Sequence, residues 1–158
     1  MKRAAFALLW LLAAAGPASA TFDDGIRAYR IRDYPAALKE FQASAANGNS
    51  EAQFYLGQMY VRGLGVNQSD TEAQRWFRSS AELGNGKAQF NLGLMYYSGQ
   101  GIRKDMELAY FWFLLSIKTD NTEVHDLAVK NRDIIGKSLS KQQQADAEAL
   151  VNVWRPKR

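Results

Sequence analysis

Apolar side chains recur along this chain with the period of an α-helix. In the segment 51–86, the positions that share one helical face, at spacings i, i+4, i+7, i+8 and i+11, are Ala52, Leu56, Met59, Tyr60 and Gly63. A second apolar face follows a short polar stretch, and it consists of Ala73, Trp76, Phe77 and Ser80. Because Gly63-Leu64-Gly65 lies between the two faces and glycine readily closes a helix, the segment is predicted to form two antiparallel helices.

The same pattern returns at once in the segment 87–122. Aligned without gaps, the segments 51–86 and 87–122 are identical at 14 of 36 positions. Most of these identities fall on the small, aromatic and apolar positions of the two helical faces. A repeat of this length is typical of an α-solenoid, in which each helix pair buries its apolar face against its neighbours.

The flanking segments carry weaker copies of the pattern. Residues 21–50 predict a first helix over 22–30 and a second one opening at Asp33-Tyr34-Pro35, since proline is favoured in a first helical turn. Residues 123–158 are assigned to a C-terminal cap of two helices, predicted over 121–137 and 140–154 and stopped by Pro156. We therefore expect an all-α, right-handed solenoid of four helix pairs, or eight helices, with the repeats at 51–86 and 87–122 in its centre.

Local signals refine these helices. Gly57 and Gly93 occupy the same place in the middle of a helix, where glycine costs about 1 kcal/mol relative to alanine, which indicates close approach of another helix. Capping boxes are predicted where a serine precedes a glutamine or glutamate by three positions. These pairs are Ser50 with Gln53, Ser69 with Glu72, and Ser140 with Gln143.

The first 20 residues have the pattern of a secretory signal peptide. Lys2 and Arg3 precede an apolar run over 4–15, and 17–20 ends in the small-x-small pattern of a cleavage site. Because 12 helical residues rise only about 18 Å, the run is too short for a membrane span. We expect cleavage before Thr21 or Phe22, a mature chain of 158 − 20 = 138 residues in the periplasm or outside the cell, and no stable membrane insertion afterwards.

Charge and composition exclude several function classes. Without Lys2 and Arg3, 18 basic residues face 16 acidic ones, and the two signs alternate, so no nucleic-acid partner is expected. The absence of cysteine excludes thiol and redox chemistry. His125 is the only histidine and lies in a polar stretch, which favours an ordinary surface residue over a metal ligand. With no nucleophile, phosphate-loop or dinucleotide motif, we expect no enzymatic activity, no metal and no cofactor.

The repeated residues A-Q-F-x-L-G-x-M-Y-x-x-G-x-G-[VI], followed by A-x-x-W-F, resemble the Sel1-like repeat, a relative of the tetratricopeptide repeat. The resemblance covers 51–122 in two complete copies. It implies an adaptor or regulatory scaffold that binds a protein or peptide. Some exported members are cysteine-rich and have penicillin-binding or β-lactamase activity, but this chain lacks their cysteines. A cell-wall or β-lactam-related hydrolase is therefore kept only as an alternative.

Positions that differ between the two copies are candidates for partner contacts, because stacking does not constrain them. On the first helix of each copy these positions recur at helical spacing and form a second face, which would line the concave side of the solenoid. The candidate partner-binding residues are Tyr55, Gln58, Arg62, Asn91, Leu94 and Tyr97.

The run Phe111–Leu115 is more apolar than its counterpart in the first copy, where Arg75, Arg78 and Ser79 stand at three of the positions. Two interpretations fit. Either the C-terminal helices cover this run, which we favour, or it forms a dimer or partner patch. A monomer is expected, with a dimer or larger homo-oligomer as the alternative.

Overall fold

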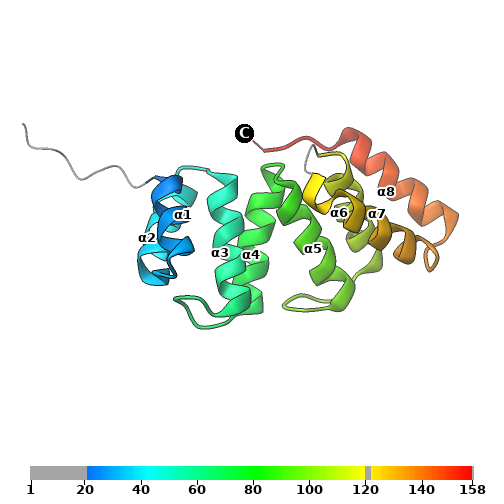
Figure 1. Cartoon of the computed structure of the whole chain (residues 1–158). Helices are drawn as coiled ribbons and strands as arrows, with labels where there is room; N and C mark the ends of the chain where they lie inside the picture. Colours follow the sequence, from blue (N-terminus) through cyan, green and yellow to red (C-terminus); the bar gives the residue numbers. More distant parts are fainter. Residues whose placement is uncertain (1–20, 120–121, 158) are drawn as a thin grey trace, which may run out of the picture.

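The computed structural model describes residues 21–119 and 122–157, which form eight α-helices and no β-strand. The helices are α1 (Phe22–Arg30), α2 (Tyr34–Ala46), α3 (Ser50–Arg62), α4 (Asp70–Glu82), α5 (Gly86–Ser98), α6 (Met106–Ile117), α7 (Thr122–Gly136) and α8 (Lys141–Val153). They form a row of helix pairs that follows the order of the chain (Figure 1). The predicted all-α solenoid is thereby confirmed, while the expected signal peptide lies outside the described residues.

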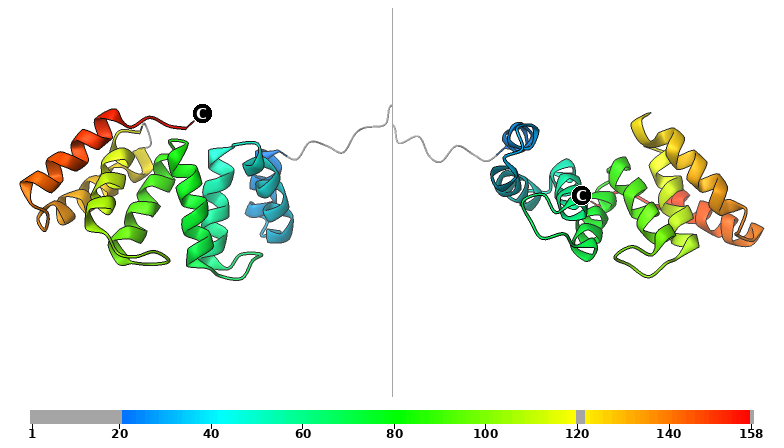
Figure 2. Two further views of the ribbon diagram at one scale, coloured as in Figure 1. Left: turned by 180° about the vertical axis from the view of Figure 1, so that it is seen from behind. Right: turned by 60° about the horizontal axis from the view of Figure 1, so that its bottom comes forward.

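The row is curved, with the first and second helices of the pairs on opposite sides. In the tilted view of Figure 2, α1, α3, α5 and α7 lie along the inner side of the curve. The second helices α2, α4 and α6 lie on the outer side, and α8 lies beyond α6. Within the described ranges, none of the helices has the length and apolar character needed to cross a membrane.

Each of the first three pairs is locked by a phenylalanine of the second helix seated on a glycine of the first. A Cβ atom added to Gly57 would lie 2.6 Å from the ring of Phe77, closer than atoms can pack. In each of the three pairs, the phenylalanine side chain is at most 1% exposed. The predicted close approach at the mid-helix glycines is therefore confirmed, and the same device recurs three times, as Gly25 with Phe41, Gly57 with Phe77, and Gly93 with Phe113.

The start of α3 differs from the prediction. Asn49, not Ser50, caps this helix, because its side-chain oxygen accepts the N–H of Ala52 at 2.9 Å. Gln53 is 8% exposed, and its amide donates to the carbonyl of Ala45 at 3.3 Å. The predicted capping box of Ser50 and Gln53 is thus wrong, since the glutamine ties α3 to the end of α2 instead.

Of the other two predicted capping boxes, the one at α4 forms only in part and the one at α8 forms completely. Ser69 caps α4 by accepting the N–H of Glu72, but the Glu72 carboxylate accepts from Arg75 rather than returning to the cap. At α8 both halves of the box form, since Ser140 accepts the N–H of Gln143 at 3.2 Å and donates its own N–H to the glutamine side chain at 2.8 Å.

The apolar run Phe111–Leu115 on α6 is covered by both C-terminal helices. Ala128 and Ile135 of α7, with Ala147 and Val151 of α8, are buried in the same core as the run. This arrangement bears out the favoured interpretation for the buried residues Trp112, Phe113 and Leu115. Coverage is incomplete, because Phe111 and Leu114 remain only partly buried.

After α8 the chain runs back across the solenoid toward the end of α4 (Figure 1). The backbone N–H of Lys157 donates to the carbonyl of Glu82 at 2.8 Å, and its ammonium group lies 2.5 Å from the Glu82 carboxylate. Pro156 sits beside Gly84, 3.3 Å from where a Cβ would be. We call residues 155–157 the C-terminal strap.

Removing the strap should destabilise the protein modestly. A chain that ends at Trp154 lacks the strap and loses the backbone hydrogen bond to Glu82 and the packing of Pro156, and we expect its free energy of unfolding to fall by about 0.5–1.5 kcal/mol. Lys157→Ala keeps the backbone bond and removes only an exposed ion pair, so its loss should be smaller. Urea unfolding followed by circular dichroism measures both. An equal loss for the two variants would show that the side chain, not the backbone, holds the strap.

Candidate functional site

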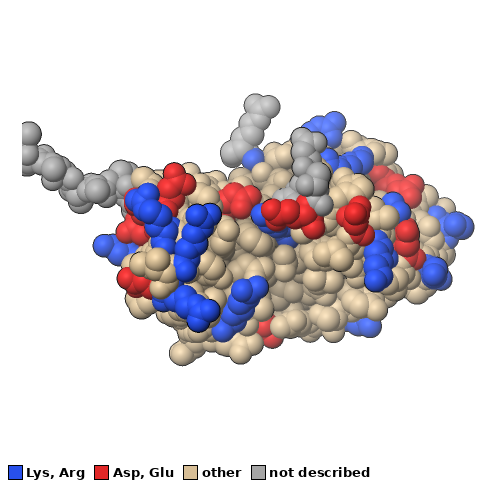
Figure 3. Space-filling model, viewed as in Figure 1, with Lys and Arg blue, Asp and Glu red and all other residues tan. Residues whose placement is uncertain are grey.

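A cavity of about 310 Å³ lies on the inner side of the curve, where four first helices meet. It receives side chains from α1, α3, α5 and α7, so it exists only when four successive helix pairs are stacked. Its lining consists of Tyr29, Phe54, Tyr55, Gln58, Arg62, Lys87 and Glu123. We call this the inner cavity. The face in Figure 3 carries charges of both signs bordering an uncharged surface.

Aromatic rings form one side of the inner cavity. Tyr55 stacks on the buried ring of Phe41, with centroids 5.1 Å apart and an angle of 19° between the planes. Tyr29 and Phe54 each meet Tyr55 edge-on, at 5.5 and 5.6 Å. Rings held in this way offer rigid contact area that loses little entropy on binding. The aromatic part of the site is therefore prearranged by the packing of α1 to α3.

Charged side chains complete the lining of the inner cavity. The Lys87 ammonium lies 2.8 Å from the Glu123 carboxylate, which joins α5 to α7. This bond raises the pKa of Lys87 above its usual value, although partial burial acts in the other direction, and Glu51 adds a smaller upward effect. Because the pKa of Lys87 is higher in the folded chain than in the unfolded one, where it is about 10.4, the ion pair stabilises the fold fully below that pH. This stabilisation is lost only as the pH rises through the raised pKa, so it is present at neutral pH. Arg62 lies exposed in the last turn of α3.

The six predicted contact residues separate into two groups. Tyr55, Gln58 and Arg62 come together in the inner cavity. Their counterparts on α5 do not line it. Asn91 and Leu94 are half-buried, the first donating to the carbonyl of Lys87 at 2.8 Å and the second packing against the core.

Tyr97, the last of the six, is 37% exposed near the end of α5, with the Lys104 ammonium 5.6 Å from its ring centroid. Its environment thus differs from that of Tyr55, whose ring is part of the packing. Replacing Tyr55 by alanine would remove this packing together with the surface hydroxyl, so conservative changes are needed to test its role.

Four residues of the cavity were not among the candidate contact residues: Tyr29, Phe54, Lys87 and Glu123. Phenylalanine stands at this position in both copies, so Phe54 was assigned to stacking. Its counterpart Phe90 is buried, with 9% of its surface exposed, but Phe54 is only partly buried. Lys87 replaces Glu51 of the first copy, and this charge reversal was a usable signal. Nothing in the sequence places Tyr29 of α1 beside α3.

The one histidine of the chain does not line the inner cavity. His125 lies on α7 with its ring nitrogen 3.2 Å from the carboxylate of the adjacent Asp126, which is itself exposed. No group of three or more histidine, aspartate or glutamate side chains within the described ranges is placed to hold a metal ion. The inner cavity combines aromatic area with a charged rim, an arrangement suited to binding a polypeptide segment.

Comparison with known proteins gives a consistent result. The family model described as Sel1 repeat matches residues 50–85 and 86–118. No curated protein matches the chain. Among solved structures, the chain is similar to a protective antigen of uropathogenic Escherichia coli strains that displays an SLR fold, with 33% identity, a TM-score of 0.76, and coverage of 88% of this chain and 30% of the antigen.

A second similar structure is a Sel1 repeat protein from Oxalobacter formigenes, with 28% identity and a TM-score of 0.60. The match covers 80% of this chain and 59% of that protein. The chain thus spans less than two thirds of either solved structure.

Proposed function

Since the chain belongs to the Sel1 repeat family, we propose that its inner cavity binds a segment of a partner protein. Members of this family are generally scaffolds for protein–protein interaction rather than catalysts, and the proposal assigns that role to a defined surface of this chain. The signal-like pattern of residues 1–20 supports a place of action in the periplasm or outside the cell.

One observation carries the proposal, namely that a single cavity draws its lining from four first helices. Such a site has the extended shape that solenoids offer to a polypeptide, because its parts lie on successive repeats. The rings of Tyr29 and Tyr55 favour an apolar or aromatic side chain of the partner. The guanidinium of Arg62 favours a carboxylate, for which it has paired donors. The partner segment should therefore carry an apolar residue close to an acidic one.

The test is affinity capture of the mature chain, residues 21–158, from a periplasmic extract, followed by identification and binding measurements with the purified partner. Arg62→Glu should weaken binding by about tenfold or more, because it sets like charges against each other. Arg30→Glu is the matched control, since it is also an exposed arginine in the last turn of a first helix but does not line the cavity. The control should leave binding within about twofold of wild type.

Tyr55→Phe provides a second variant that keeps the stacking on Phe41 and removes only the hydroxyl. We expect unchanged stability and a moderate loss of affinity if this hydroxyl contacts the partner. A partner retained equally by Arg62→Glu and Arg30→Glu would contradict the assignment of the inner cavity. Turnover of a β-lactam or cell-wall fragment by the purified chain would instead support the hydrolase alternative.

A further inference from the structure

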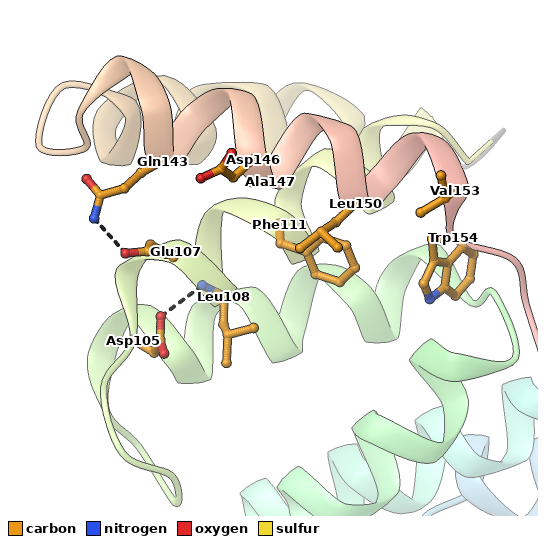
Figure 4. A pocket seen from close by; sticks show the side chains of 10 residues that line it. All are labelled: Asp105, Glu107, Leu108, Phe111, Gln143, Asp146, Ala147, Leu150, Val153 and Trp154. Atoms are coloured by element: carbon orange, nitrogen blue, oxygen red, sulfur yellow. Dashed lines mark hydrogen bonds between the residues drawn. The ribbon is translucent and has the colours of Figure 1, made fainter.

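A second cavity lies on another part of the molecule, between α6 and α8. The two helices begin at the same end of it, where the Gln143 amide donates to the Glu107 carboxylate at 2.5 Å. The cavity measures about 630 Å³, and Phe111 of α6 and Leu150 of α8 project into the space between the helices (Figure 4). We call it the terminal groove. It shares no residue with the inner cavity.

The floor of the terminal groove is apolar although it faces solvent. Leu108 is 39% exposed, Leu150 58% and Val153 71%, so three of the seven large, exposed hydrophobic residues of the described ranges gather here. Phe111 and Trp154 add partly buried aromatic area. Single apolar side chains on a surface are normal, but a contiguous group in a hollow marks an interaction site.

Acidic residues border the end of the groove at which α6 and α8 begin. Asp105 caps α6 by accepting the N–H of Leu108 at 2.9 Å. Glu107 and Asp146 accept hydrogen bonds from the neutral amides of Gln143 and Gln142, so these bonds leave their negative charges in place. The residues that line the groove include no lysine or arginine, although the mature chain carries 18 basic residues against 16 acidic ones. The acidity is therefore local to this groove.

From this combination we propose that the terminal groove binds an amphipathic α-helix of a partner protein, with an apolar stripe on one face and lysine or arginine at one end. The walls are helices, whose backbone groups are already hydrogen-bonded along their own axes. A helix satisfies its own backbone hydrogen bonds and presents an apolar stripe that can pack between two such walls. α8 has 13 residues and is about 20 Å long, which matches a partner helix of three to four turns.

Charge also decides against a second copy of the chain as the occupant. A symmetric dimer places the same surface of both copies in contact. A contact between two terminal grooves would bury Asp105, Glu107 and Asp146 of both copies, and the residues that line the groove include no lysine or arginine to pair with them. Basic side chains of a different protein would supply that complementary charge.

The probe for the experiment is a fluorescein-labelled amphipathic peptide of leucine and lysine, about 14 residues long, with its leucines at helical spacing. Binding to the full mature chain is measured by fluorescence anisotropy. A peptide with the same leucines and with glutamate in place of lysine tests the charge, and we expect it to bind about tenfold more weakly or worse. A leucine and lysine peptide of scrambled order tests the need for the apolar stripe and should bind equally weakly.

Variants of the protein locate the binding. Leu150→Ser should weaken binding of the lysine peptide by about tenfold, whereas Leu127→Ser should change it by less than twofold. Leu127 is a matched control because it is 50% exposed on the neighbouring helix α7 and lies outside the groove. Both side chains are largely in solvent, so neither change should unfold the protein. Arg62→Glu, at the inner cavity, should leave this binding unchanged.

Three outcomes would overturn the proposal. The first is an equal effect of Leu150→Ser and Leu127→Ser, and the second is equal binding of the lysine and glutamate peptides. The third is a wild-type chain that fails to bind the lysine peptide and forms a dimer in light scattering, with Leu150→Ser dissociating that dimer. None of these outcomes involves the inner cavity, so none of them bears on the proposed function, which is tested separately by the Arg62→Glu variant.

Discussion

Phe77→Ala should lower the free energy of unfolding by about 3–5 kcal/mol, the range for an aromatic side chain removed from a packed core. The ring is 1% exposed and lies directly on Gly57 of α3, with Phe54 at 5.9 Å between centroids. Alanine would leave a void in the centre of the solenoid between two rigid helices. The helix α3 also packs against α2, and α4 also packs against α5. Neither helix can therefore move into the void without disturbing the neighbouring pair.

The control for this prediction is Phe111→Ala. Phe111 belongs to the same residue type but lies half-buried at the terminal groove, so its removal should cost only about 1–2 kcal/mol, in proportion to the smaller area it buries. Urea unfolding monitored by circular dichroism measures both losses. Equal losses would contradict the tight packing of Phe77 between α3 and α4, because its greater burial alone already predicts the larger loss.

Gly57→Ala tests the same contact from the opposite side. In an exposed helix this change gains up to about 1 kcal/mol from helix propensity. Here the new methyl group would lie 2.6 Å from ring atoms of Phe77, so the ring or α4 must shift. We expect a net loss of about 1–3 kcal/mol, as for other overpacked cores, and a lower midpoint in thermal unfolding.

Gly136→Ala is the matched control within a helix. A Cβ at this position would lie 3.4 Å from the ring of Tyr110, an ordinary contact, so the variant should be as stable as the wild type or slightly more stable. The double variant Gly57→Ala/Phe77→Leu should lose less than the sum of the two single changes, since the smaller side chain relieves the clash. A stabilised Gly57→Ala would refute the close packing of α3 against α4.

The helices and their order were predictable because local periodicity and repetition determine them. The identity of Gly57 and Gly93 in the two copies signalled a packing requirement, and the structure shows the phenylalanine ring that imposes it. The cap of α3 was not predicted, although the signal was present. Asn49 and Asn85 occupy equivalent places and both act as caps, while the equivalent Gln53 and Gln89 both reach back to the preceding helix.

The candidate site was predicted in part for a physical reason. Comparing the two copies identifies positions that stacking leaves free, and in this way it found Tyr55, Gln58 and Arg62 of the inner cavity. It cannot find a residue that serves packing in one copy and lines a cavity in the other, as Phe54 does. The same comparison singled out Phe111 of the terminal groove, as part of the apolar run Phe111–Leu115. It could not give the groove itself, because the groove depends on how α8 packs against α6, and no second copy of that contact exists in the described residues.

The C-terminal strap makes the two ends of the solenoid unequal. Helix contacts elsewhere join neighbours in the row, so an open solenoid can unravel from either end, one helix at a time. The hydrogen bond from Lys157 to Glu82 joins residues 75 positions apart and turns the part from α5 to α8 into a closed loop. Unravelling from the α8 end must first break that contact. Within the described residues, α1 and α2 pack against α3 and the segment that follows it, and no contact of this long range holds them. Partial opening of this protein should therefore begin at α1, beside the aromatic side of the inner cavity.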